Sequence, residues 1–579
     1  MTDHISTDYT PDCAAPRLVT DKAQCGILAD ILAANGVNTV FVNPGSRDAP
    51  LIVELARDDR FDTHVVIDER SAAFMALGLA TRVRRPVALV CTSGTAVLNY
   101  APAVAEAYYR QIPLIVISAD RPKEWIDQDD SQTIRQAGVL GNIVKQSVDI
   151  ADDAMPTRLW MASRLINDAM LTALTAPCGP VHINMQFDEP LTRMTAVDTR
   201  PATKLITAVR TEASLPTAVV RGLASELACR RKVLVIVGFQ SPNDRLNRAL
   251  SRLSELDNVV VMHEAQANLH CPRFVANIDT VLSRMTDRQR TDLKPDVVIT
   301  IGGALVSRFV KAWLRDDSNP IEHWQVGVRG LSVDCFKSMV KRVEAAPAQF
   351  FSQLAGALRM LRAEISSTYA ADMRRLSEDA VTSSEQYADR SPWSDLTAMR
   401  RLISRIPSSW DVQVSNGTAV RYMQLFDYSR LHRIDANRGV SGIDGSTSTA
   451  IGAALGTSGV TMLITGDMSA QYDMGALAFH GIPATFKMAV LNNAGGGIFR
   501  FVKSTSALPE LDRYFAADVR LPLRELAHAY GFAYHEASDP DGLDKAFADF
   551  AAETERPAIL NIITPGELSA EILTNYFKR

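Results

Sequence analysis

Short runs rich in β-branched residues alternate with longer helical stretches along the whole chain of 579 residues, and this alternation limits the possible folds more than any other feature. It is typical of βαβ units, in which helices connect parallel strands and cover the sheet. The expected strands are residues 39–42, 64–67, 87–90, 114–117, 181–184, 233–237, 259–261, 297–301, 411–414, 433–435, 462–464, 487–491 and 558–563. The pattern predicts an α/β protein with three doubly wound parallel-sheet domains.

Two interruptions divide the expected strands into three groups. Residues 194–217 have no clear period and contain two prolines, which is typical of a linker. A long charged helical stretch, residues 346–387, precedes a second break at residues 391–394. A length of roughly 150 residues per domain suggests three or four domains. The predicted domains are residues 1–195, residues 196–390 (the linker and a central domain) and residues 391–579.

Composition and charge exclude several classes of protein. The chain has 61 Lys and Arg residues against 66 Asp and Glu residues and no basic block, which argues against nucleic-acid binding. Its longest apolar runs are far shorter than the roughly 20 residues of a membrane-spanning helix, and the acidic N-terminus does not resemble a secretory signal. Seven scattered cysteines predict neither a disulfide framework nor structural zinc. We therefore expect a cytoplasmic protein.

Small, polar and charged residues follow the expected strands in the first and last thirds of the chain. In doubly wound sheets, ligands bind beyond the carboxyl ends of the strands, where helices begin and offer free N–H groups. The segments concerned are residues 43–47, 68–70, 92–95, 119–122, 415–417, 436–439, 466–467 and 492–499. These segments are the candidates for a ligand site.

Asp467 follows an expected buried strand, and Asn493 follows the next one. Carboxylate, amide and main-chain oxygens suit Mg²⁺, which favours sites shared with a phosphate. The glycines at 495–497 would let the backbone approach a diphosphate closely. A helix N-cap followed by an ordinary turn would produce the same short motifs, so the motifs alone leave both interpretations open.

Glu69 lies at an expected strand end within apolar sequence. A carboxylate in such a place can be a buried acid or base with a shifted pKa. The alternative is that Glu69 pairs locally with Arg70 or simply belongs to the first turn of a helix.

Taken together, Glu69 and the Asp467 and Asn493 motifs resemble the thiamine-diphosphate-dependent enzymes with pyruvate-decarboxylase-like architecture. Several further segments are similar to the MenD synthases of menaquinone biosynthesis within that group. These segments are residues 43–47 (NPGSR), 92–96 (TSGTA), 119–122 (ADRP), 134–136 (IRQ), 437–445 (NRGVSGIDG) and 492–499 (NNAGGGIF). The resemblance covers both outer domains at many separate places, whereas the central domain matches mainly in pattern.

The resemblance implies a pyrimidine-binding first domain, a central domain and a diphosphate- and metal-binding third domain. It also implies a transferase that uses thiamine diphosphate and Mg²⁺ or Mn²⁺. Its reaction would decarboxylate 2-oxoglutarate and add the resulting succinyl carbanion equivalent to isochorismate in a 1,4 sense, giving 2-succinyl-5-enolpyruvyl-6-hydroxy-3-cyclohexene-1-carboxylate. In this reaction Glu69 would hydrogen-bond the aminopyrimidine ring and favour its imino tautomer, while the cofactor serves as the electron sink.

The implied substrates are dicarboxylates, and arginine grips carboxylates with its planar, permanently charged fork. Residues matching the family's substrate-contacting motifs are Ser46, Arg47, Arg121, Gln132, Arg421 and Arg438, and Arg308 in the central domain is a further candidate. The predicted catalytic residues are Glu69, Arg47, Arg121, Gln132 and Arg438. A solvated surface side chain remains the alternative for any one arginine taken alone.

The family resemblance also implies the residues that bind the cofactor. They are Glu69, Gly94, Asn416, Gly442, Ile443, Asp467, Met468, Ser469, Asn493, Gly495, Gly496, Ile498 and Phe499. Within this set, Asp467, Asn493 and Gly495 are the predicted metal ligands.

Two other functions compete with this prediction. An acetolactate-synthase-like enzyme or 2-oxoacid decarboxylase acting on monocarboxylates would use the same cofactor but would need an apolar substrate pocket. A non-catalytic α/β binding protein would keep the folds without the chemistry, and the combination of Glu69, Asp467 and Asn493 argues against it. Because the motifs are split between the first and last domains, we expect a homodimer or homotetramer with shared active sites.

Overall fold

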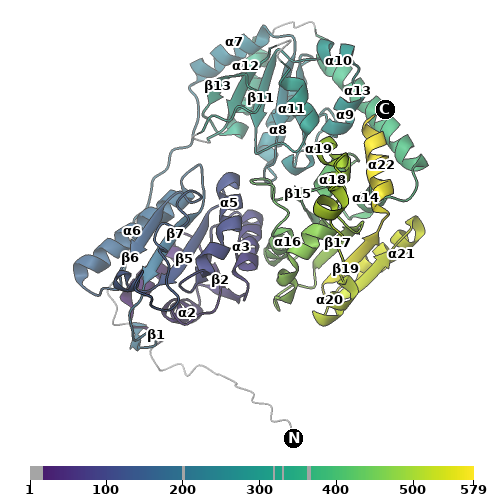
Figure 1. Ribbon diagram of the computed structural model, residues 1–579. Helices are drawn as coiled ribbons and strands as arrows, with labels where there is room; N and C mark the ends of the chain where they lie inside the picture. Colours follow the sequence, from purple (N-terminus) through teal and green to yellow (C-terminus); the bar gives the residue numbers. More distant parts are fainter. Residues whose placement is uncertain (1–16, 198–201, 317–319, 329–330, 362–366, 579) are drawn as a thin grey trace.

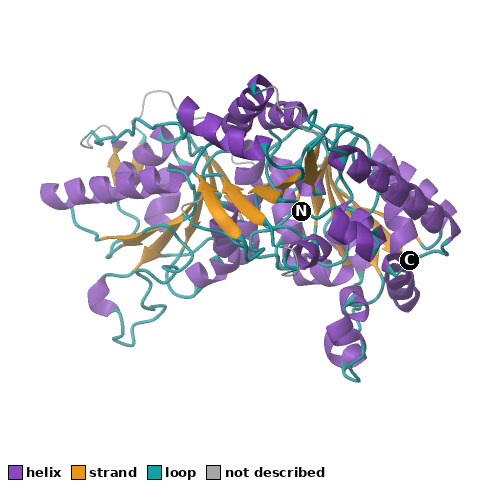
Figure 2. Cartoon of the chain, turned by 90° about the horizontal axis from the view of Figure 1, so that it is seen from above, coloured by secondary structure: helices purple, strands orange, loops and turns teal. Residues whose placement is uncertain are grey.

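Three parallel β-sheets with helices on both faces make up the computed structural model, which confirms the predicted α/β class (Figure 1). The structure describes residues 17–197, 202–316, 320–328, 331–361 and 367–578. Figure 2 shows the three sheets in orange, enclosed by purple helices. No helix in these ranges is both long and apolar enough to cross a membrane.

The first sheet has six parallel strands in the order β3-β2-β4-β5-β7-β6. Its strands are β2 (Thr39–Val42), β3 (Asp62–Val65), β4 (Val87–Cys91), β5 (Leu114–Asp120), β6 (Ser147–Ile150) and β7 (Val181–Gln186). Its helices are α1 (Ala23–Ala34), α2 (Ala49–Ala56), α3 (Glu69–Val83), α4 (Ala96–Asn99), α5 (Ala101–Arg110), the short η1 (Lys123–Trp125) and α6 (Pro156–Leu174). A small antiparallel pair, β1 (Leu18–Thr20) with β8 (Met194–Ala196), lies beside it.

The central sheet has five parallel strands in the order β10-β9-β11-β12-β13. They are β9 (Val233–Val237), β10 (Val259–His263), β11 (Val297–Ile301), β12 (Glu322–Val326) and β13 (Met339–Val343). The helices are α7 (Thr217–Ala228), α8 (Asp244–Leu253), α9 (Ile278–Arg284), α10 (Asp287–Asp292), α11 (Arg308–Leu314), α12 (Pro347–Met360) and α13 (Tyr369–Arg390), with η3 (Ala265–Ala267). Separate apolar clusters cover the two faces of this sheet.

The third sheet has six parallel strands in the order β15-β14-β16-β17-β19-β18. They are β14 (Asp411–Val414), β15 (Arg433–Asp435), β16 (Thr461–Gly466), β17 (Phe486–Asn492), β18 (Ala533–Ala537) and β19 (Ala558–Ile563). The helices are α14 (Asp395–Arg405), α15 (Ala419–Tyr422), α16 (Ser446–Leu455), α17 (Asp467–Tyr472), η4 (Met474–Ala478), α18 (Gly497–Phe501), α19 (Lys503–Ser506), η5 (Leu511–Ala516), α20 (Leu523–Ala529), α21 (Pro540–Ala552) and α22 (Gly566–Phe577).

The first and third sheets have the same topology. In each, the first strand in the chain lies between the second and the third, so the winding direction reverses between β2 and β4 and again between β14 and β16. Such a reversal opens a crevice beyond the carboxyl ends of the two strands, and this is where ligands bind in doubly wound sheets. The topology therefore marks one candidate crevice in each outer domain.

Helices α3 and α16 join the outer domains within one chain, as Figure 1 shows. A Cβ atom on Gly78 would lie 1.9 Å from the carbonyl oxygen of Thr449, and one on Gly452 would lie 1.9 Å from that of Met75. Only glycine permits so close an approach of two helices. One continuous apolar cluster accordingly includes residues of both domains.

Each of the strands expected from the sequence has a counterpart, although β3 begins two residues earlier than expected. The sequence analysis missed the strands β1, β6, β8, β12, β13 and β18. Of these, β6, β13 and β18 are edge strands with polar side chains, so they lack the apolar runs of central strands.

The prediction of a single helical stretch over residues 346–387 was wrong, because two helices, α12 and α13, lie there. Ser367 Oγ accepts a hydrogen bond from the backbone N–H of Tyr369 just before α13 begins. Serine favours such local bonds over helix interiors. The expected linker has no helix or strand over residues 202–216.

Candidate active site

The first domain brings two of the predicted substrate-binding arginines together beyond its sheet. Arg47, in the loop after β2, is buried and donates from Nη1 to the carbonyl oxygen of Phe187 at 2.9 Å. Arg121 follows β5 directly. Burial lowers the pKa of Arg47, and the neighbouring charge of Arg121 lowers it further. The two guanidinium groups therefore form one cationic region.

Gln132 and Gly94 lie together beside the end of β4. The Gln132 side chain donates a hydrogen bond to the main-chain carbonyl oxygen of Ser93 at 3.1 Å. The main-chain carbonyl oxygen of Gln132 accepts one from Ser93 Oγ at 3.0 Å. Gly94 has a positive φ of 85°, and a Cβ atom on it would lie 3.1 Å from the Gln132 side chain. Ser46 is exposed next to Arg47.

Glu69 is the first residue of α3, and its carboxylate accepts a hydrogen bond from Asn99 Nδ2 at 3.3 Å. Asp68 caps the helix by accepting from the backbone N–H of Arg70. Glu69 does belong to the first turn of a helix, as the alternative interpretation held. That position leaves its carboxylate half-buried at the edge of the sheet, where a ligand can reach it.

Arg70 contacts the third domain rather than Glu69. Its Nη2 donates to the carbonyl oxygen of Tyr472 at 2.9 Å, and its guanidinium carbon lies 4.9 Å from the centre of the Tyr472 ring. Its Nη2 also lies 3.8 Å from the buried carboxylate of Asp473. Arg70 thereby fixes the start of α3 against the end of α17 in the same chain.

The third domain places Asp467 at the start of α17, almost fully buried. Its two carboxylate oxygens accept from the backbone N–H groups of Met468 at 2.7 Å and Gly495 at 3.0 Å. Burial raises the pKa of Asp467 to about 6. The bond to Gly495 ties the glycine run after β17 to the residue after β16.

Asn493 contributes an amide oxygen beside this carboxylate. Its Nδ2 donates to Asp395 Oδ2 at 2.8 Å, which fixes the orientation of the amide, while its buried Oδ1 has no hydrogen-bond partner within the described residues. An unsatisfied buried oxygen near a buried carboxylate fits an oxygen-preferring cation such as Mg²⁺ or Mn²⁺. No group of three His, Cys, Asp or Glu side chains in the described ranges could hold a metal alone, so a metal here would also need main-chain and ligand oxygens.

The loops after β14 and β15 come together through Asn416. Its amide donates at 2.6 Å to the carbonyl oxygens of Asn437 and Gly442, and its own oxygen accepts from Arg438 Nη1 at 2.7 Å. Ser469 Oγ in α17 donates to the carbonyl oxygen of Ile443 at 2.6 Å. These bonds connect the segment around Gly442 and Ile443 with the segment around Asp467.

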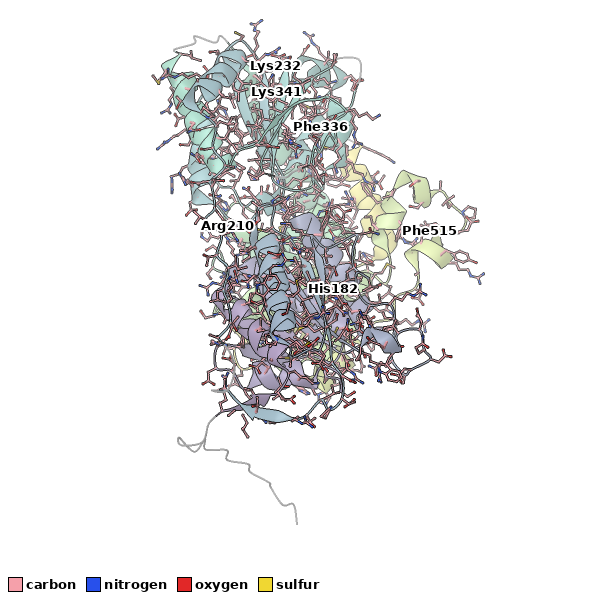
Figure 3. The ribbon with its side chains drawn as sticks, turned by 90° about the vertical axis from the view of Figure 1, so that its left-hand side faces the viewer. His182, Arg210, Lys232, Phe336, Lys341 and Phe515 are labelled. Carbon is pink, nitrogen blue, oxygen red and sulfur yellow. The ribbon has the colours of Figure 1, made fainter. Side chains whose placement is uncertain are left out.

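The glycine run packs against the end of η5. A Cβ atom on Gly496 would lie 2.9 Å from the carbonyl oxygen of Phe515 and 3.0 Å from Met468 Sδ, so glycine is required there. The rings of Phe499 and Phe515 lie 5.8 Å apart. Figure 3 shows Phe515 on the segment that projects from the third domain. Ile498, the residue before Phe499, is half-buried at the base of that segment.

A second arginine cluster forms where the central domain meets the third domain. It consists of Arg308 at the start of α11, Arg421 in α15 and Arg438 after β15. Burial lowers the pKa of Arg421, and the charges of Arg308 and Arg438 lower it further. Nε of Arg421 and Nε of Arg438 are buried without a hydrogen-bond partner in the part of the chain that the structure describes. The cluster can therefore accept an anionic ligand.

Two buried acids behind this cluster were missed by the sequence analysis. Glu264 follows β10 and accepts from the backbone N–H groups of Val306 and Ser307, both at 2.8 Å. Asp279 in α9 lies against Ser307 as well. Both acids hold the start of α11, which carries Arg308. Glu264 directly follows a strand end, so the rule applied to the outer domains could have found it.

The pKa of Glu264 gives a testable pH dependence. Burial raises this pKa to about 7 from an ordinary 4.5, so the folded chain keeps a proton that the unfolded chain releases. The stabilising contribution of the protonated form is complete below pH 4.5 and is lost as the pH rises through about 7. At about 1.4 kcal/mol per pKa unit the loss is at most about 3 kcal/mol. We expect the melting temperature of Glu264→Gln, relative to the wild type, to rise between pH 5 and pH 8.

Thermal melts of both proteins across this pH range test the expectation. Glu344→Gln is a matched control, because the side chain of Glu344 in the same domain is 55% exposed. A difference between Glu264→Gln and the wild type that does not change with pH would refute the assignment.

Within one chain no direct bond joins the two halves of the candidate site in the part that the structure describes. No hydrogen bond or ion pair between described residues links Glu69, Arg47 or Arg121 to Asp467 or Asn493. The surface beside Glu69 is apolar and uncovered, since Val65 is 61% and Ile67 is 85% exposed. Exposed apolar surfaces of this kind are typical of protein interfaces.

The sequence is similar to those of several known proteins. Residues 26–139 match the family model described as thiamine pyrophosphate enzyme, N-terminal TPP binding domain. The chain is 36% identical to a 2-succinyl-5-enolpyruvyl-6-hydroxy-3-cyclohexene-1-carboxylate synthase of Porphyromonas gingivalis, over 96% of this chain and 97% of that protein. It is 37% identical to the synthase of the same name in Flavobacterium psychrophilum, over 95% and 98% of the two chains. It is 34% identical to the synthase of the same name in Desulfotalea psychrophila, over 91% of this chain and 96% of that protein.

Proposed function

The chain belongs to the family of 2-succinyl-5-enolpyruvyl-6-hydroxy-3-cyclohexene-1-carboxylate synthases, and from this premise we propose that it catalyses the reaction for which those enzymes are named. The family confirms the predicted dependence on thiamine diphosphate and a divalent metal ion. The proposed reaction decarboxylates 2-oxoglutarate and adds the remaining succinyl unit to isochorismate. The product places the enzyme in menaquinone biosynthesis.

The observation that carries the proposal is the pair of arginine clusters, which lie beyond the strand ends of the outer domains, where a cofactor would bind. Each proposed substrate has two carboxylates, and each arginine cluster offers permanently charged donors in a fixed fork. In the first domain the donors are Arg47 and Arg121, with Ser46 and Gln132 beside them. In the third domain they are Arg421 and Arg438, and Arg308 adds a donor from the central domain.

The residues around Asp467 fit a metal ion and a diphosphate. Asp467, Asn493 and the main chain at Gly495 would ligate Mg²⁺ or Mn²⁺, because they offer a carboxylate, an unsatisfied amide oxygen and a backbone carbonyl. The proposed contacts to the rest of the cofactor come from Gly94, Asn416, Gly442, Ile443, Met468, Ser469, Gly496, Ile498 and Phe499. Thiamine diphosphate supplies the electron sink for decarboxylation when it is bound.

Glu69 would share a proton with a ring nitrogen of the cofactor's pyrimidine. Its carboxylate lies at the start of α3, oriented by Asn99, with a half-buried face free to meet a ligand. A carboxylate can give and take a proton at this atom, whereas an amide cannot. The arginines would orient the two dianions.

The active site would be shared between two chains of a homodimer or homotetramer. Glu69 from one chain would meet the Asp467 region of the other, and the exposed apolar surface around Ile67 would be buried at the interface. The proposed division of labour gives residues 1–195 to pyrimidine binding, residues 196–390 to the linker and central domain, and residues 391–579 to diphosphate and metal. We also place the enzyme in the cytoplasm.

An assay with purified protein, thiamine diphosphate and Mg²⁺ tests the proposed function. We expect consumption of isochorismate and release of CO₂ that both require 2-oxoglutarate. Pyruvate in place of 2-oxoglutarate should support little turnover, because its single carboxylate cannot satisfy the arginine clusters. Equal turnover with pyruvate would instead establish a monocarboxylate enzyme of the acetolactate-synthase or decarboxylase type.

A further inference from the structure

Both arginines of the first-domain cluster are paired with carboxylates of their own chain. Arg121 Nη1 lies 2.8 Å from Asp130 Oδ2, and Arg47 Nη1 lies 3.4 Å from Glu189 Oε1. The charge of Asp130 also reaches Arg47. Asp130 therefore faces the whole cationic region that the proposed function assigns to a substrate carboxylate.

Asp130 is on an exposed loop that is anchored on either side of it. Before it, the loop leaves β5 at Arg121, and after it Gln132 is held by two hydrogen bonds with Ser93. The carbonyl oxygen of Asp130 accepts from Thr133 Oγ1 at 2.9 Å, whereas its carboxylate is one-third exposed and reaches towards Arg121. The carboxylate can thus turn into solvent without any change at the anchored ends.

Moving the Asp130 carboxylate away from Arg121 raises the free energy of the protein only while no other anion takes its place. Arg47 is buried and close to Arg121, so without Asp130 Arg121 would lose its ion pair while facing a like charge that only Glu189 balances. Asp130 contacts Arg121 through one oxygen at Nη1, and Arg121 Nε has no hydrogen-bond partner within the described residues. A substrate carboxylate could take both positions with its two oxygens. A partly exposed ion pair of this kind is worth only up to about 1 kcal/mol, so a dianion held by other residues as well can displace it.

We propose that Asp130 occupies the place of a substrate carboxylate on Arg121 and is displaced when a dicarboxylate binds. This inference rests on the proposed function, which supplies the dicarboxylate. Asp130 is then a specificity-determining residue. A ligand with a second carboxylate replaces it, whereas a monocarboxylate held elsewhere in the site leaves the ion pair in place and gains nothing from Arg121.

Asp130→Asn tests the proposal, because the amide keeps the size of the side chain but not its charge. We expect the KM of one or both dicarboxylate substrates to fall by about two- to fivefold, with kcat changed less than twofold. A merely structural role cannot tighten substrate binding. Asp127→Asn is the matched control, because Asp127 lies on the same loop and pairs with the exposed Arg135 at 2.7 Å.

An unchanged or raised KM for both substrates in Asp130→Asn, with normal melting behaviour and an unchanged Asp127→Asn, would overturn the proposal. Turnover by the wild type in the same assay keeps this result separate from a failure of the proposed function. If the wild type does not turn over, calorimetric titration of the holoenzyme with 2-oxoglutarate or succinate still tests Asp130. Binding that is tighter in Asp130→Asn supports displacement, and equal or weaker binding refutes it.

Discussion

Replacement of Glu69 by glutamine is expected to leave the fold intact and to lower kcat by about two to four orders of magnitude. Glutamine has the same shape and can keep the contact with Asn99, whose Nδ2 donates to Glu69 at 3.3 Å. It cannot give or take the proton at the pyrimidine ring. The start of α3 should not move, since the cap by Asp68 and the contacts of Arg70 with the third domain do not involve Glu69.

Steady-state kinetics with 2-oxoglutarate and isochorismate measure this loss, and thermal melts check the fold. Glu124→Gln makes the same chemical change at an exposed position of the first domain and should keep full activity. Turnover by Glu69→Gln within a few-fold of the wild type would remove Glu69 from the mechanism.

Replacement of Asp467 by asparagine is expected to abolish binding of the metal and the diphosphate, and activity should fall by about a hundredfold or more. The amide can still accept a hydrogen bond from Met468 or Gly495, but it offers the cation no charge. Without ligands the melting temperature of the variant should change little, because removal of a buried charge opposes the loss of one of the two backbone hydrogen bonds.

A thermal-shift titration with thiamine diphosphate and Mg²⁺, together and separately, measures this effect. Ligand at a hundred times its Kd stabilises the folded wild type by about 2.7 kcal/mol, so its melting temperature should rise. Asp467→Asn should show no rise. Asp541→Asn, at a fully exposed side chain of the same domain, should behave as the wild type. A normal shift in Asp467→Asn would place the metal elsewhere.

The architecture could be predicted because each domain repeats one physical pattern. Buried parallel strands need apolar runs, and the covering helices need amphipathic ones, so the alternation is visible in the sequence. The rule that ligands lie beyond strand ends then selects Asp467, Asn493 and Arg438. Their roles came only from the family resemblance, since each short motif alone also fits an ordinary helix cap or turn.

Contacts between distant parts of the chain could not be predicted. Arg70 and Tyr472 are separated by 402 positions, and nothing in either local sequence indicates that they meet. Similarly, the sequence does not show that Arg308 meets Arg421, because Glu264 and Asp279 hold the start of α11 in place only in the folded chain. Tertiary packing decides such pairs, and the sequence pattern of a single element does not record it.

The central claim is that each active site combines Glu69 of one chain with Asp467 of another, and mixing two inactive variants tests it most directly. Glu69→Gln and Asp467→Asn are produced together so that hybrid dimers form. A shared site gives each hybrid one intact site out of two, and random pairing makes half of the dimers hybrid, so about a quarter of the wild-type activity should return. Activity no higher than the sum of the two separate variants would contradict the account, because a site built within one chain cannot be restored by a partner.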